Sequence, residues 1–177
     1  MLISQLLLSA VVGTNPYFQD VALDVRGDRI YCSASLEESF TPDLDRLLQS
    51  GDNVIIHFEV DVVDQATDSV VALSDWEHHL RYSLLEDNYT LFNSETGRNL
   101  TIDDFDIAKS RWVRVEDALI CRMRDLREGG RYYLRMSAFM EDVSLPGITE
   151  KINMMAFWNR IRPTYESDPF EKRELVL

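Results

Sequence analysis

The sequence is poor in the residue types that mark disulfide-bonded and glycine-rich proteins. Its 177 residues include only 2 cysteines, 7 glycines and 5 prolines. Little glycine leaves scant room for phosphate-binding loops, and one cysteine pair is too few for a disulfide framework. Cys32 and Cys121 both lie among alternating apolar residues. Two buried thiols and a single disulfide both fit this pattern.

Basic residues are also outnumbered. The 18 Lys and Arg stand against 31 Asp and Glu, which gives a formal net charge of −13. Because this charge repels phosphate groups at long range, nucleic acid and anionic lipid surfaces are poor partners.

The composition and length are those of one globular domain. Hydrophobic residues make up 45% of the chain, which excludes wholesale disorder. We expect a single domain over residues 18–162 and a loose acidic tail over residues 163–177. Residues 1–17 are expected to be an export signal or an edge segment, because residues 1–13 are apolar but hold no Lys or Arg. This run is too short to span a bilayer as a helix, and no longer one follows.

Alternating apolar and polar residues predict antiparallel strands over much of the chain. Two alternating runs about Gly27 predict a hairpin. The clearest strand is residues 53–64, whose apolar side chains share one face. Further strands are expected at residues 70–73, 76–85 and 89–92. Helix-start residues predict two short helices, one from Thr41-Pro42-Asp43 to Gly51 and one that opens at residues 101–104 and continues to Lys109.

Residues 115–126 fit a helix and a strand almost equally well by periodicity. The residues from Leu126 to Tyr132 help to decide, because they have the form L-x-x-G-x-x-Y. In immunoglobulin-like sandwiches, a tyrosine near the start of a late strand turns its hydroxyl back onto upstream backbone at a corner between the two sheets. The motif favours a strand over residues 115–125. The expected fold is mainly β, an antiparallel immunoglobulin-like β-sandwich with two short helices.

The best candidate for a metal or ligand site is one face of the strand at residues 53–64. His57, Glu59 and Asp61 alternate there, and zinc accepts such ligands. His78 and His79 are adjacent and would point to opposite faces of a strand, so at most one could join. A solvated outer strand face explains the same pattern. We therefore assign no metal, cofactor-binding or catalytic residue and keep this face as the alternative hypothesis.

No motif for enzyme chemistry is present. The sequence lacks G-x-S-x-G, a P-loop and G-x-G-x-x-G. Pairs of acids occur, but they arise by chance in so acidic a chain. A hydrolase would require carboxylates such as those of Glu37, Asp61 and Glu141 to converge in a cleft. We expect that the protein is not an enzyme.

A group of arginines between residues 111 and 135 is unusual in such an acidic chain. If this region forms a hairpin, Arg122 and Arg124 share a strand face and Arg131 and Arg135 pair across from them. Ion pairing within the chain explains the group. The functional alternative is a basic strip that docks an acidic peptide or headgroup. The members are Arg111, Arg114, Arg122, Arg124, Arg127, Arg131 and Arg135.

Several of these pieces, taken in order over residues 20–158, resemble a bacterial family of uncharacterised proteins, domain of unknown function 4390. The resemblance implies no established activity, cofactor or catalytic residue. Members look exported, and in some bacteria they are encoded beside a membrane sensor kinase. The pieces are Arg29-Ile30-Tyr31, the helix from Pro42 to Gly51 and the strand after it, Leu80-Arg81-Tyr82 with Tyr89, the helix near Ile102–Ala108, the L-x-x-G-x-x-Y corner and Leu145-Pro146.

These observations together predict a non-catalytic β-sandwich module of the bacterial cell envelope that binds another protein. The resemblance makes a membrane-anchored sensor or envelope component the expected partner. A sandwich leaves edge strands that can accept a strand from such a partner. The expected location is the periplasm or envelope, or the cytoplasm if residues 1–13 are not a signal.

Overall fold

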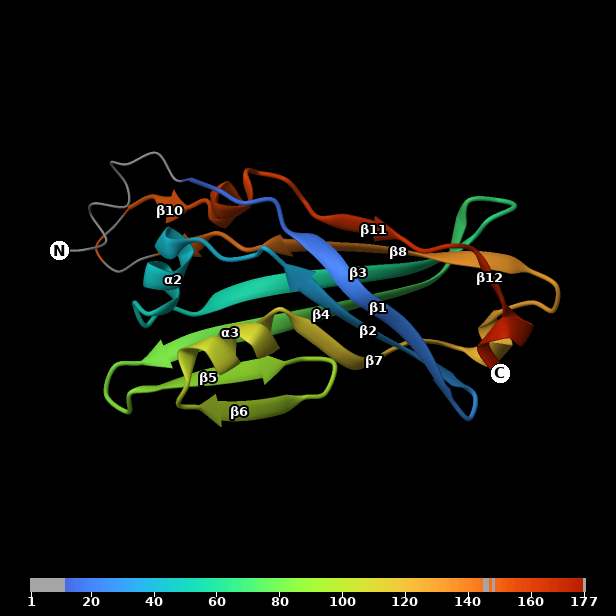
Figure 1. The fold of residues 1–177 in the computed structure, drawn as a ribbon, viewed down its shortest axis with the longest axis horizontal. Helices are drawn as coiled ribbons and strands as arrows, with labels where there is room; N and C mark the ends of the chain where they lie inside the picture. Colours follow the sequence, from blue (N-terminus) through green and yellow to red (C-terminus); the bar gives the residue numbers. More distant parts are fainter. Residues whose placement is uncertain (1–11, 145–146, 148, 177) are drawn as a thin grey trace.

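The computed structural model describes residues 12–144, 147 and 149–176. Most of these residues lie in strands, with a few short helices between them (Figure 1). The helices are α2 (Pro42–Leu48) and α3 (Phe105–Trp112), with 3-10 helices η1 (Met123–Asp125), η2 (Met154–Trp158) and η3 (Lys172–Val176). The strands are β1 (Tyr17–Arg26), β2 (Arg29–Glu37), β3 (Val54–Asp64), β4 (Ser69–Ser83), β5 (Asn88–Asn93), β6 (Arg98–Ile102), β7 (Arg114–Arg122), β8 (Arg131–Met140), β9 (Val143–Ser144), β10 (Lys151–Ile152), β11 (Thr164–Glu166) and β12 (Phe170–Glu171).

The strands form a large antiparallel sheet and a small one. The large sheet has the order β11-β8-β3-β4-β5-β6, and β12 also pairs with β8. The small sheet has the order β1-β2-β7, and β9 pairs with β10 separately. Figure 1 shows the β1–β2 hairpin crossing diagonally over the large sheet. The prediction of a mainly β, antiparallel fold with two short helices is confirmed.

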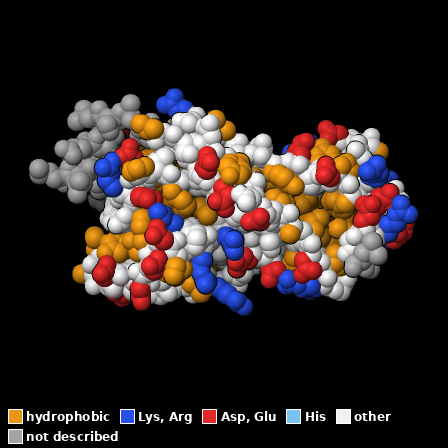
Figure 2. Space-filling model, in the orientation of Figure 1, with side chains coloured by type: hydrophobic (Ala, Val, Ile, Leu, Met, Phe, Trp, Pro, Cys, Tyr) orange, Lys and Arg blue, Asp and Glu red, His pale blue; other side chains and the backbone are white. Residues whose placement is uncertain are grey.

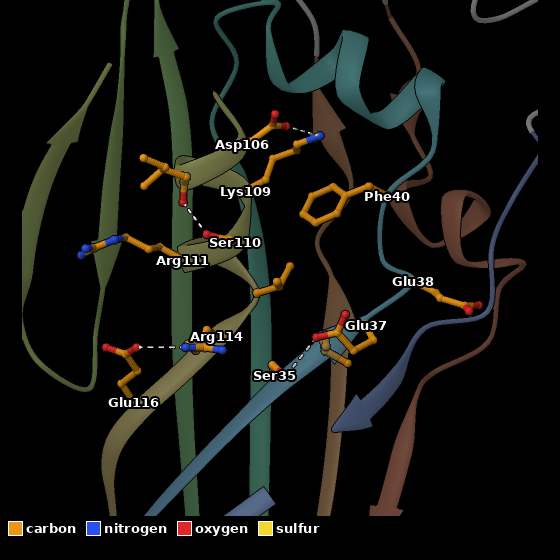
Figure 3. Close-up of a pocket in the computed structure, with 13 residues that line it drawn as sticks. Ser35, Glu37, Glu38, Phe40, Asp106, Lys109, Ser110, Arg111, Arg114 and Glu116 are labelled. Carbon is orange, nitrogen blue, oxygen red and sulfur yellow. Dashed lines mark hydrogen bonds and ion pairs between the residues drawn. The ribbon is translucent and has the colours of Figure 1, made fainter. Parts of the chain in front are cut away.

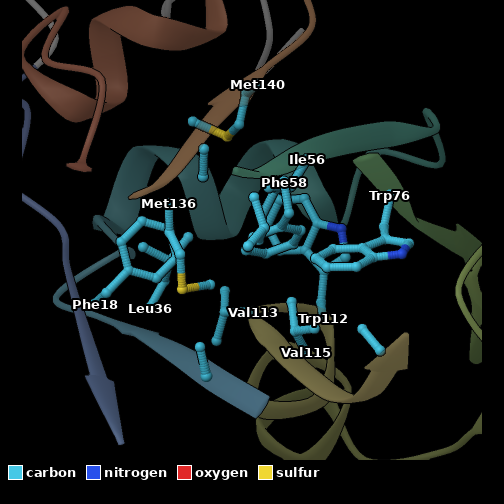
Figure 4. Close-up of a cluster of buried hydrophobic side chains, with 14 of the residues drawn as sticks. Phe18, Leu36, Ile56, Phe58, Trp76, Trp112, Val113, Val115, Met136 and Met140 are labelled. Carbon is cyan, nitrogen blue, oxygen red and sulfur yellow. The ribbon is translucent and has the colours of Figure 1, made fainter. Parts of the chain in front are cut away.

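Side chains from both sheets meet in one hydrophobic core. Strand β3 alternates buried and half-buried residues along most of its length, as the sequence pattern predicts. The small sheet contributes Ile30 and Leu36, and α3 contributes Trp112, which is fully buried. Figure 4 shows Phe18 beside Leu36 and Met136, so strands of the two sheets contact one another there.

The two helices begin at capping residues. Thr41 Oγ1 accepts a hydrogen bond from the Leu44 amide at 3.2 Å, as the sequence predicts for α2. For α3 the prediction was wrong in its bounds, because Asp104 caps it by accepting from the Ile107 amide at 2.9 Å. Thr101 and Ile102 belong instead to β6 and pair with β5. The helix also continues past Lys109 to Trp112.

The tyrosine corner at the start of β8 is formed. Residues 114–122 are a strand, which confirms the prediction for most of residues 115–125. Tyr132 is fully buried, and its hydroxyl accepts a hydrogen bond from the Arg127 amide at 2.9 Å. The ring packs so close to Gly130 that a Cβ there would lie 2.5 Å from the hydroxyl oxygen.

Two predictions concern the ends of the chain: one falls largely on residues outside the described part of the structure, and the structure differs from the other. Of residues 1–17, expected to be a signal or an edge segment, the first eleven lie outside the described residues, and β1 begins at Tyr17. Residues 163–177, expected to be a loose tail, instead include β11 and β12, which pair with β8. The outer edge of β8 offers unpaired backbone groups, and these strands satisfy them.

Candidate functional site

A groove lies between the end of β2 and helix α3 (Figure 3). The segment at residues 35–40 forms one wall, and residues 106–116 form the other. The Leu36 amide donates to the Val113 carbonyl at 3.0 Å, which fixes the separation of the two walls. The cavity has a volume of about 600 Å³, and an adjoining hollow of about 360 Å³ shares Ser35, Arg114 and Glu116 with it.

Lys109 closes one end of the groove. Its ammonium lies 3.0 Å from Asp45 Oδ2 and 3.3 Å from Asp106 Oδ1. It also sits over the rings of Phe40 and Phe105, at 5.0 and 4.5 Å from their centroids. Because two carboxylates and two rings hold this ammonium, it shapes the groove rather than offering a free charge.

Three acidic residues along the groove have left-handed backbone conformations. Asp20, Glu38 and Asp117 have φ values of 54°, 52° and 52°. Asp20 and Asp117 stand at irregularities in the β1–β2 and β2–β7 pairings, where an extra residue bends the strand. Such conformations are unfavourable for most residues with a Cβ, but Asp tolerates them, and they also occur at the hairpin-turn residues Asp68 and Asp87. They place Asp20, Glu38 and Asp117 along the rim of the groove and hollow.

Carboxylates outnumber cationic groups in the groove and hollow. Leu36, Phe40 and Ile107 make parts of the lining apolar, and the Ile107 side chain is half exposed. An open channel with an acidic rim and apolar patches suits an extended, cationic polypeptide segment. The acids are Asp20, Glu37, Glu38, Asp106, Glu116 and Asp117, and the cations are Lys109, Arg111 and Arg114.

His57, Glu59 and Asp61 lie on one face of β3, as predicted, but His57 and Glu59 contact side chains from other segments. His57 Nε2 lies 2.6 Å from Glu141 Oε1, and the His57 ring stacks on the ring of Phe139. Glu59 forms an ion pair with Arg162. Asp61 lies two residues further along β3. Within residues 12–144, 147 and 149–176, no three His, Cys, Asp or Glu side chains form a group that could hold a metal ion.

His78 and His79 point to opposite faces of β4, as predicted. His79 is on the outer face, where Nε2 lies 2.9 Å from Glu77 Oε2. His78 is fully buried, with Nδ1 2.8 Å from the Trp112 carbonyl oxygen and Nε2 2.9 Å from Glu95 Oε1. The indole Nε1 of Trp112 donates in return to the His78 carbonyl at 2.9 Å. This buried network joins β4, α3 and the β5–β6 turn, and it holds α3 in place beside the groove.

The predicted basic strip is not formed. Strands β7 and β8 lie in different sheets, so residues 111–135 are not a hairpin. Arg127 pairs with buried Asp64, and Arg135 pairs with Glu166 and Asp68. These pairs support the structural explanation of the arginines. Arg111 and Arg114 instead lie at the groove, where Arg114 contacts Glu116 at 3.9 Å.

The other candidates also lie apart. Glu37 lines the groove and accepts from the Ser35 hydroxyl at 3.2 Å, whereas Glu141 binds His57 on the outer face of the large sheet. Cys32 and Cys121 are both buried and free, so no disulfide joins them. Neither α2 nor α3 is long and apolar enough to cross a membrane.

The sequence profile of one family, described as a domain of unknown function (DUF4390), matches residues 15–166. The chain belongs to the DUF4390 family. The resemblance expected from residues 20–158 is therefore confirmed, and the match reaches into β11. No curated protein and no solved structure matches the chain.

In this DUF4390 member, the sequence predicts neither the groove nor the residues that make it. Glu37 and Glu38 are indistinguishable in the sequence from a chance pair of acids. Phe40 and Ile107 carry no motif, and their walls are about 70 residues apart in the chain. Asp20 and Asp117 have left-handed conformations at irregularities in the strand pairing. The alternation of apolar and polar residues does not reveal these positions, because Asp occurs both in left-handed conformations and elsewhere.

Proposed function

We propose that this DUF4390 protein is a non-catalytic interaction module of the bacterial cell envelope that binds an extended segment of another protein in the groove beside α3. The observation that carries the proposal is the lining of this groove. Six carboxylates and three cations line the groove and its adjoining hollow. Lys109 pairs with Asp45 and Asp106, Arg114 with Glu116, and Asp117 with Arg26, so within the described residues Asp20, Glu37 and Glu38 are the lining carboxylates without a Lys or Arg partner. The site therefore favours a segment that combines Lys or Arg with apolar residues.

The shape of the groove supports a polypeptide rather than a small molecule. The main cavity and its hollow run along the β2–β7 seam and are open to solvent, whereas small-molecule sites enclose most of their ligand. The Ser110 hydroxyl on the groove wall donates to the Ile107 carbonyl at 2.9 Å and keeps its own acceptor lone pairs. An extended chain can donate to such a group through its own backbone.

The finer description of the fold is part of the same proposal. The two sheets share one core, and the Tyr132 hydroxyl bonds back to upstream backbone at the corner between β7 and β8. Both features support an immunoglobulin-like sandwich. Many such domains are binding scaffolds whose function resides in loops and edges.

The envelope location and the class of partner rest on two further observations. The sequence of residues 1–13 is apolar, which supports export. The family context supports a membrane-anchored sensor or another envelope protein as the partner. An acidic groove suits a protein segment better than a phosphate-rich surface.

The test is site-specific photocrosslinking in the source bacterium. A photoreactive phenylalanine replaces Ile107 on the groove wall, and the matched control carries it at Thr90, which is exposed on the outer face of β5. We expect one discrete protein adduct from position 107, in the envelope fraction, and none from position 90. In the position-107 variant, Glu37→Lys with Glu38→Lys should reduce this adduct about tenfold, because a cationic segment would then be repelled. Identical adducts from positions 107 and 90, no adduct from 107, or a purely cytoplasmic protein would overturn the proposal.

A further inference from the structure

Three hairpin turns of the large sheet are built in the same way. In each, the amide of the fourth turn residue donates to the carbonyl four residues earlier: Asp68 to Asp64 at 2.8 Å, Asp87 to Ser83 at 2.9 Å and Gly97 to Asn93 at 2.9 Å. Asp68, Asp87 and Gly97 have positive φ values of 52°, 51° and 64°. Since the three turns share one backbone geometry, a comparison of their sequences shows which residues this geometry requires.

The turn between β4 and β5 is the exception in composition. Its first two residues are Leu84 and Leu85, whose side chains are 71% and 100% exposed. The equivalent pair in the β3–β4 turn is Gln65-Ala66, and in the β5–β6 turn it is Ser94-Glu95. Because the same backbone forms with these residues, the turn does not require leucine. Neither leucine is part of the hydrophobic core.

The fold holds these leucines on a braced tip. The Ser83 hydroxyl accepts from the Glu86 amide at 3.3 Å, and the Tyr82 hydroxyl donates to Asp87 Oδ1 at 2.6 Å. The Tyr82 ring in turn lies 4.9 Å from that of Tyr89. A partner that binds this tip would not have to order it first, which favours affinity.

The surroundings of the tip are acidic. Glu86 and Asp87 follow the leucines. Asp52 follows Gly51, which lies so near the tip that a Cβ added to it would be 3.6 Å from a methyl carbon of Leu84. Arg81 is the nearby cation, and its Nε donates to the Gly51 carbonyl at 3.3 Å. Figure 2 shows apolar and acidic side chains side by side at the end of the molecule that carries this turn, at the left in Figure 1.

We propose that the Leu84–Leu85 tip is a second docking surface, which inserts into an apolar pocket with a basic rim on a partner protein. The inference rests on the proposed role in protein binding and adds a contact to it. Exposed aliphatic side chains on a preorganised turn provide the apolar anchor, and Glu86, Asp87 and Asp52 provide the complementary charge.

Charge favours this occupant over the two others that an apolar tip could meet. An anionic bilayer would repel both the acids beside the leucines and the net charge of −13. A second copy of the chain offers the groove beside α3, but carboxylates outnumber cations there as well. A basic-rimmed pocket on another protein has neither disadvantage.

The test places a photoreactive phenylalanine at position 85 of the full chain in the source bacterium. Thr96, which is exposed on the sister turn between β5 and β6, is the matched control position. We expect one protein adduct from position 85 and none from position 96, and the crosslinked peptide, located by mass spectrometry, should hold apolar residues flanked by Lys or Arg. The variant Leu84→Gln with Leu85→Ala copies the β3–β4 turn and so preserves the fold. With the photoreactive residue at position 107, this variant should lower the adduct yield about tenfold or more.

Each other outcome overturns the docking surface. Adducts with lipid, or flotation of the purified protein with phosphatidylglycerol vesicles that the double variant abolishes, would assign the tip to a bilayer. Adducts between two copies would assign it to self-association, and no adduct at position 85 would remove the site. If position 107 still gives its adduct in any of these cases, the proposed function stands while this inference fails.

Discussion

Replacing Gly130 by alanine should destabilise the protein even though its backbone conformation is not left-handed. An added Cβ would lie 2.5 Å from the Tyr132 hydroxyl oxygen and 2.9 Å from two ring carbons. The ring is fully buried and cannot move aside. Overpacking of this kind costs about 1–3 kcal/mol, and displacing the hydroxyl from the Arg127 amide costs about 1 kcal/mol more. We expect Gly130→Ala to lower the free energy of unfolding by about 2–4 kcal/mol.

The measurement is urea denaturation of the purified protein, with Gly129→Ala as the matched control. Gly129 has φ of 70°, but a Cβ there meets nothing within 4 Å, so its replacement should cost only the conformational term of about 1–2 kcal/mol. In the Tyr132→Phe background, Gly130→Ala should cost at least about 1 kcal/mol less than in the native chain, because the closest contact and the hydrogen bond are gone. The reasoning is refuted if Gly130→Ala is no more costly than Gly129→Ala, or if its effect adds to that of Tyr132→Phe.

Three further predictions concern buried polar groups. Burial raises the pKa of both Cys32 and Cys121 to about 12, so mass spectrometry should show no alkylation of the folded protein at pH 8 and complete alkylation in denaturant. Glu95→Ala leaves His78 without its carboxyl partner and should lower the free energy of unfolding by about 3–5 kcal/mol, whereas Glu86→Ala on the sister turn should change it by under about 0.5 kcal/mol. Burial alone would raise the pKa of Asp64, but hydrogen bonds from Arg127, Ala66 and Thr67 outweigh it and hold that pKa below its usual 3.8. The native chain should therefore be more stable than Asp64→Asn at neutral pH, and this difference should shrink as pH falls from about 4 through the lowered pKa, in thermal melts at a series of pH values.

Much of the strand pattern was predictable, because alternation reports directly which side chains face a core. Residues 53–64 and the runs about Gly27 show this. The corner was also predictable, because Tyr132 makes a local contact with Arg127, only five residues away. The structure of a motif whose contacts are all local can be predicted from the residues of the motif alone.

The errors arose where distant segments decide the structure. The strands expected at residues 70–73 and 76–85 are one strand, β4 (Ser69–Ser83), because its residues from Ser69 to Leu80 pair with β3. The Ser74 hydroxyl donates to carbonyl oxygens of Leu119 and Ile120 instead of forming a turn, and Leu84 and Leu85 lie in the turn after β4. Thr101 resembles a helix cap, but β6 uses it for pairing with Thr90. The many charged residues of residues 163–177 concealed β11, a strand that pairs with β8 through its backbone.

The candidate site could not be predicted for the same reason. Its walls come from residues 35–40 and 106–116, and only the pairing of β2 with β7 brings them together. The His57 face stands out by its residue types, but those residues are satisfied by Glu141 and Arg162, which no spacing rule connects to β3. A candidate site assembled across two sheets leaves no local trace in the sequence.

The pairing of β11 and β12 with β8 also sets an order of assembly. During synthesis, β3 and β8 can pair as soon as both have emerged, but the outer side of β8 stays open until residues 164–171 follow. A newly made chain therefore passes through a stage in which one long strand can recruit a neighbouring chain. Residues 164–171 end this stage when they pair with β8 and cover its outer edge.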